Sequence, residues 1–125
     1  MLTPRTLDGD VSFDRPLSEV KAELFRALGH AGRVRILEVL SDGDQTVGEL
    51  AALVGLEPSH LSQQLGVLRR VGAVTVQRVG STATYSLTSP EVRELLAVAK
   101  AFLLANLRAR QELLGVEPAA QRTQA

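Results

Sequence analysis

The sequence predicts a mainly helical domain with one β-hairpin, in the order α-α-α-α-β-β-α, and three observations support this fold class. Apolar residues recur every three or four positions in several stretches, which is the period of a helix with one buried face. Two stretches that alternate with period two flank Gly80-Ser81, which is typical of a hairpin. The chain has 125 residues, enough for a single hydrophobic core.

The first three helices are expected between Pro16 and Gly55. The first ends at Gly29, and the second follows from about Ala31. The third opens with a capping box, in which the Thr46 hydroxyl accepts from the backbone N–H of Glu49 and the Glu49 carboxylate accepts from that of Thr46.

A fourth helix is expected from Pro58, because proline suits a first helical position where its missing N–H would be unpaired anyway. Three intervening residues (55–57) make the third and fourth helices a helix-turn-helix. Strands over residues 74–79 and 82–87 then form the hairpin, or wing. The expected fold class is therefore a winged helix-turn-helix, whose second helix is exposed for a DNA groove.

The last helix, from Pro90, carries an apolar stripe that is too long for the small core above it, which favours a homodimer seam. Packing within one monomer is the alternative. On this helix the expected dimer interface comprises Leu95, Ala99, Phe102, Leu103 and Leu107. Residues 17–114 are expected to form the DNA-binding and dimerisation domain, after a flexible arm (1–16) and before a disordered tail (115–125).

The net charge of zero hides an uneven distribution. Residues 1–57 carry six basic and ten acidic side chains, a net charge of −4, whereas residues 58–110 carry seven and two, a net charge of +5. No Asp or Glu occurs between residues 58 and 89. A neutral total does not argue against a nucleic-acid partner, because binding needs only a local basic face.

The fourth helix and the wing therefore supply the candidate DNA-binding residues, and double-stranded operator DNA is the expected partner. Glutamine can pair with adenine through two hydrogen bonds, and Ser or His can reach base edges or phosphates. The candidates are Ser59, His60, Ser62, Gln63, Gln64, Arg70, Arg78, Ser81 and Thr82. An ordinary solvated helix face is the alternative, but such a face usually carries Glu and Lys. Arg33 and Arg35 open a buried helix, so at least one is expected to be a structural ion-pair partner.

Three segments in this order resemble motifs of the ArsR/SmtB family of dimeric winged-helix bacterial repressors. They are residues 25–37 (FRALGHAGRVRIL), 61–69 (LSQQLGVLR) and 78–87 (RVGSTATYSL). The resemblance covers roughly residues 17–110. It implies that the first and last helices make the dimer, which adds Leu17, Val20 and Leu24 to the expected interface. It also implies that an inducer loosens DNA binding.

The metal sites of that family are not reproduced in this sequence. Its thiolate site aligns with residues 46–50, where both cysteines are absent. Its inter-subunit site aligns with Ser89, Glu91, Phe102 and Ala105, and neither Phe nor Ala can ligate a metal. We therefore expect no metal or other cofactor. A metal-responsive repressor with a non-standard site stays an alternative, and its possible ligands are Asp8, Asp10, Asp14 and His30.

Several other classes are disfavoured. The chain has no cysteine and no glycine-rich phosphate loop, and its two histidines lack a Cys partner, so we expect no enzyme. No apolar run approaches the ~20 residues that span a bilayer, and no apolar leader opens the chain, so we expect a cytoplasmic protein. A winged helix used only for protein contact remains an alternative. The effector stays open: a small organic molecule, a partner protein or none.

Overall fold

The computed structural model describes residues 15–115 and contains five helices and three strands in that range. The elements are α1 (Leu17–Leu28), α2 (Ala31–Ser41), β1 (Gln45–Thr46), α3 (Val47–Val54), α4 (Pro58–Arg70), β2 (Val74–Val79), β3 (Thr82–Leu87) and α5 (Pro90–Leu114). The expected arm and tail fall almost wholly on residues 1–14 and 116–125, outside the described residues.

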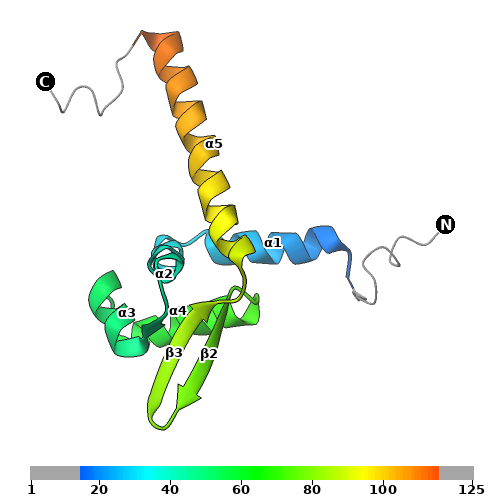
Figure 1. Ribbon diagram of the computed structural model, residues 1–125. Helices are drawn as coiled ribbons and strands as arrows, with labels where there is room; N and C mark the ends of the chain where they lie inside the picture. The colour runs from blue at the N-terminus through cyan, green and yellow to red at the C-terminus, as the bar shows by residue number, and fades with distance from the viewer. Residues whose placement is uncertain (1–14, 116–125) are drawn as a thin grey trace, which may run out of the picture.

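A small body made of α2, α3 and α4 carries the hairpin, α1 and α5 (Figure 1). The hairpin leaves this body in one direction, and α5 projects from it in the other. The core lies between α2, α3 and α4, where apolar side chains are removed from water. Its fully buried members are Ile36, Leu37, Leu40, Leu50, Leu61, Leu65 and Leu68.

The fold class and the hairpin are confirmed. Strands β2 and β3 pair antiparallel from Val74↔Leu87 to Val79↔Thr82, the bounds that the period-two pattern predicts. Gly80 takes a φ of +62° at the turn, a left-handed conformation that glycine adopts without steric cost. Within residues 15–115, no helix combines the length and apolar character needed to cross a membrane.

Strand β1 corrects the predicted element order. Its two residues pair with β3, Gln45 with Tyr85 and Thr46 with Thr84. A two-residue strand has no period to detect, and its pairing is made by the backbone. The same Thr46 begins the predicted capping box, which is confirmed by bonds of 3.2 Å to its hydroxyl and 2.8 Å to Glu49 Oε1. The wing is therefore tied through β1 to the start of the helix-turn-helix.

Candidate nucleic-acid interface

The turn between α3 and α4 sets the direction of the second helix. Gly55 ends α3 with a φ of +73° and donates its N–H to Ala51 O at 2.9 Å. Helix α4 then begins at Pro58 and buries Leu61 and Leu65 completely against the core. Because one face is fixed in this way, the opposite face of α4 points to solvent.

The outer face of α4 brings together four of the candidate DNA-binding residues. The side chains of Ser59, His60, Ser62 and Gln63 are all exposed. They offer hydroxyl, imidazole and amide groups, and no carboxylate occurs on α4 or on the hairpin. Such a face can donate to and accept from base edges without repelling phosphate.

The expectation that Gln64 lies on this outer face is wrong. Its exposed fraction is 8%, and Arg33 Nη1 donates to its Oε1 at 2.8 Å. Gln64 follows Leu61 by three positions and precedes Leu68 by four, so it shares the buried face. The helical spacing was therefore the signal that could have placed Gln64 on the buried face. A buried amide is tolerated there when it is hydrogen-bonded.

Arg33 has the structural role expected for at least one of the two arginines in α2, although it uses carbonyls instead of a carboxylate. Its Nε donates to Ala27 O at 2.5 Å and its Nη2 to Arg26 O at 3.5 Å. Arg35 makes the ion pair, with Glu38 at 3.9 Å on the surface. Exposed pairs of this kind contribute little to stability.

The wing residues are also exposed. Arg78, Ser81 and Thr82 lie at or beside the tip of the hairpin, with Arg78 opposite Ala83 in the register. Val79 was not among the predicted DNA-binding residues, but its side chain is 70% exposed beside them. Arg70 is exposed at the far end of α4, four residues before the hairpin begins at Val74.

The candidate dimer residues divide into two groups. Leu17, Ala99, Phe102, Leu103 and Leu107 are exposed, Phe102 by 63%, whereas Val20, Leu24 and Leu95 are half-buried within the monomer. No residue of α5 is buried, and the helix projects beyond the body (Figure 1). Its exposed apolar side chains therefore form a long surface outside the core. Other large apolar side chains exposed on α1 and α5 were not predicted: Phe25, Val98, Leu104 and Leu113.

The described residues contain no group of three or more His, Cys, Asp or Glu side chains that could hold a metal ion. His30 caps α2, and its Nδ1 accepts the N–H of Gly32 at 3.0 Å. The three aspartates of the alternative site (Asp8, Asp10 and Asp14) lie outside residues 15–115, so that alternative is not tested.

Comparisons with known proteins agree with this geometry. The model of the family "Bacterial regulatory protein, arsR family" matches residues 30–76. The Mycobacterium tuberculosis protein Rv0081, named an uncharacterized HTH-type transcriptional regulator, is 51% identical over 100 residues, 79% of this chain and 88% of that protein. Its crystal structure matches with a TM-score of 0.73 over 78% of this chain and 98% of that one.

Three further relatives show the range of this similarity. A homodimeric winged helix-turn-helix domain, Mb0332 from Mycobacterium bovis, has a TM-score of 0.71 at 25% identity and covers 80% of this chain and 94% of its own. The biofilm growth-associated repressor of Xylella fastidiosa is 37% identical, over 60% of this chain and 66% of its own. The Vibrio cholerae transcriptional activator HlyU is 38% identical, over 58% and 68%.

Proposed function

The chain belongs to the ArsR family of bacterial regulatory proteins, and we propose that it is a homodimeric repressor that binds an inverted-repeat operator. The family consists of winged helix-turn-helix transcriptional regulators, which are not enzymes. The observation that carries the proposal is the acid-free outer face of α4, which continues into an exposed wing.

In the proposed complex, α4 enters the major groove and the wing follows the sugar-phosphate backbone. Ser59, His60, Ser62 and Gln63 face the base edges. Arg70 and Arg78 lie at opposite ends of this surface, where each guanidinium would bind phosphate. Ser81 and Thr82 at the wing tip would add hydroxyl contacts to the backbone. Gln64 is left out because its side chain is buried and already bonded to Arg33.

The exposed apolar surface of α5 is proposed as the dimer seam, together with the exposed part of α1. Burial of Phe102 and Leu103 against a second copy would remove large apolar side chains from water. Leu17, Ala99 and Leu107 would complete the contact, while Val20, Leu24 and Leu95 support it from within each monomer. A two-fold dimer places two recognition helices about 34 Å apart, which matches an operator with two inverted half-sites.

We also propose a cytoplasmic location, where operator DNA is found, and an effector that is not a metal ion. The positions that would ligate a metal between subunits hold Phe102 and Ala105, which have no donor atom. Residues 17–114 carry the whole proposed function.

The test is selection of bound fragments from genomic DNA by the purified full-length protein, followed by a reporter assay at the selected sites. We expect enrichment of an inverted repeat and lower reporter expression when the protein is present. Ser62→Glu is the matched interface variant and should abolish enrichment, because its carboxylate would lie in the groove. Enrichment without a repeat would contradict the proposal, and higher expression would identify an activator. Absence of enrichment would favour a winged helix that contacts only proteins.

A further inference from the structure

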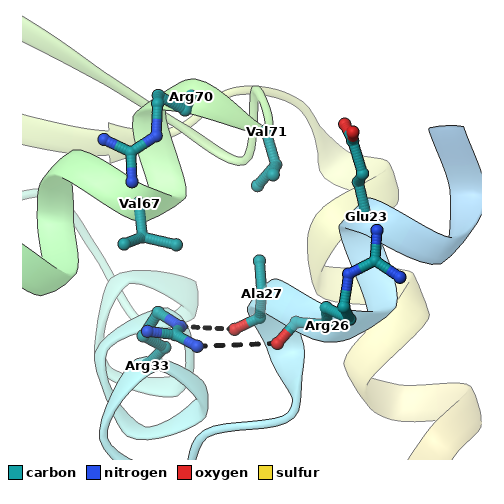
Figure 2. Close-up of a pocket in the computed structure, with 7 residues that line it drawn as sticks. All are labelled: Glu23, Arg26, Ala27, Arg33, Val67, Arg70 and Val71. Atoms are coloured by element: carbon teal, nitrogen blue, oxygen red, sulfur yellow. Dashed lines mark hydrogen bonds between the residues drawn. The ribbon is translucent and has the colours of Figure 1, made fainter.

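A cleft of about 570 Å³ lies between α1, α2 and the C-terminal end of α4 (Figure 2). Its charged side chains are Glu23 and Arg26 from α1, Arg33 from α2 and Arg70 from α4. Three arginines from three helices therefore line one hollow. The guanidinium of Arg33 is already bonded to the carbonyls of Ala27 and Arg26 and to Gln64, which leaves Arg26 and Arg70 for a ligand. The proposed DNA interface does not explain this arrangement, since only Arg70 belongs to it.

The single acid in this cleft offsets only part of its positive charge. The Glu23 carboxylate forms an ion pair with Arg15, and the hydrogen bond from that guanidinium lowers the pKa of Glu23 below its usual value. Among residues 15–115, neither Arg26 nor Arg70 lies within 4.0 Å of a carboxylate. The planar fork of a guanidinium matches the oxygens of a carboxylate or a phosphate, so the cleft favours an anion.

The rest of the wall is apolar. Val67 of α4 and Val71, which directly follows α4, line one side, and Ala27 lines the side formed by α1 (Figure 2). Small-molecule sites typically measure roughly 300–1,000 Å³ and combine an apolar wall with a few polar groups that orient the ligand. The volume and lining of this cleft meet both conditions.

We propose that this cleft is the regulatory site for a small organic anion, an apolar body with one carboxylate or phosphate group, whose binding releases the operator. The proposal rests on the proposed function, because it takes α4 as the helix that reads DNA.

The direction of the effect follows from Arg70. Arg70 lines the cleft and is an exposed residue of the proposed DNA surface, so its guanidinium cannot bind the ligand's oxyanion and a DNA phosphate at the same time. Arg33 provides a second route, because it lies in the cleft and holds Gln64 of α4. An anion that draws Arg33 away from Gln64 would remove a hydrogen bond that holds α4 in place. Both routes make the ligand and the operator oppose each other, and each must weaken the other by the same factor.

The first experiment titrates the DNA-free, full-length dimer with benzoate, phenyl phosphate and the neutral benzamide, and follows amide NMR signals. We expect saturable binding of at least one anion, with one site per protomer, shifts at Val67 and Val71, and an affinity at least about tenfold above that of benzamide. Preference for one anion would identify the head group. Absence of saturable binding by both anions below about 10 mM, or equal binding of benzamide, would overturn the proposal.

Variants separate the cleft from general charge effects. Arg26→Ala and Arg26→Glu should each weaken anion binding at least about tenfold, because both remove a guanidinium from the cleft. The backbone carbonyl that receives Arg33 is retained in both, and operator affinity without probe should stay unchanged. The matched control is Arg35→Ala, an exposed arginine two positions from Arg33 and outside the cleft, which should bind the anion normally. Unchanged anion binding by both Arg26 variants would overturn the assignment.

The second experiment measures operator affinity with and without saturating probe at constant ionic strength, since added salt alone weakens protein–DNA binding. We expect the anion to raise the operator Kd at least about fivefold, within the usual range of coupling between sites. Anion binding without any change in operator Kd would contradict the regulatory role. Failure to bind any DNA in the absence of probe would instead contradict the proposed function, while the DNA-free titration still tests the cleft.

Discussion

Arg33 Nη1 donates a hydrogen bond of 2.8 Å to Oε1 of Gln64, which joins α2 to the buried face of α4. Gln64 is the one buried polar side chain among residues 15–115. The same guanidinium also donates to the last carbonyls of α1, those of Ala27 and Arg26 (Figure 2). The Arg33 side chain therefore fixes α4, the proposed DNA-reading helix, relative to α1, a helix of the proposed dimer seam.

This bond predicts an energetic coupling between the two residues. Gln64→Ala should destabilise the protein by about 1–3 kcal/mol, because it leaves a part-buried donor of Arg33 without its partner. Arg33→Met should also destabilise, and in the double variant the two losses should fail to add by about 0.5–3 kcal/mol. Urea unfolding at one fixed protomer concentration measures all four free energies. Additivity within about 0.3 kcal/mol would show that the bond contributes no coupling.

Gln63 should instead affect base preference and leave stability unchanged. Gln63→Ala is expected to cost about 1–3 kcal/mol of discrimination at a single operator position, the value of one bidentate contact. Its free energy of unfolding should change by less than about 0.5 kcal/mol, because the side chain is exposed. Competition binding against a set of single-base operator variants gives the readout. An equal loss for operator and random DNA would show that Gln63 does not read a base.

Arg78 should contribute affinity without sequence preference. Arg78→Ala is expected to weaken operator and random DNA alike and to reduce the slope of log Kd against log salt concentration by about one. Fluorescence anisotropy over a series of salt concentrations measures the slope. Arg35→Ala is the control, since it removes an equal charge outside the proposed interface. A loss confined to the operator would make Arg78 a base reader instead.

Metal ions should leave operator affinity essentially unchanged. A metal acts on the DNA equilibrium only through different affinities for the free and bound states, and Phe102 and Ala105 supply no ligand where the family's inter-subunit site aligns. The full-length protein, first stripped with a chelator, would be titrated with Zn²⁺, Ni²⁺, Co²⁺ and Cd²⁺ in the presence of labelled operator. A tight, saturable site that changes affinity more than about tenfold, ~1.4 kcal/mol, would contradict this and direct attention to Asp8, Asp10 and Asp14.

Much of the fold was predictable because its elements carry strong local signals. Gly80 and the period-two pattern gave the hairpin its bounds, and the capping box placed the start of α3 at Thr46. Strand β1 was missed because its pairing with β3 is a long-range backbone contact, in which two residues of β1 pair with two residues of β3. Local periodicity carries no information on contacts of that kind.

The candidate site was predicted less completely, and Gln64 shows why. Residue type suggested a solvent-facing amide, but its helical spacing from Leu61 and Leu68 placed it inside, where Arg33 satisfies it. The apolar residues of α1 are divided between two surroundings. Val20 and Leu24 pack within the monomer, whereas Phe25 is 57% exposed on α1. A helix that contacts two neighbours has two apolar faces, and sequence alone does not assign each face to its neighbour.

The most direct test of the proposed two-fold dimer on an inverted repeat compares the selected palindrome with the same palindrome carrying about five extra base pairs, half a helical turn, at its centre. The insertion moves one half-site to the opposite side of the duplex, where a rigid dimer cannot reach both. We expect the operator Kd to rise roughly 100-fold, to the level of an isolated half-site, while wild-type spacing binds two protomers per duplex. Equal affinity for both duplexes would contradict a two-fold dimer that reads paired half-sites.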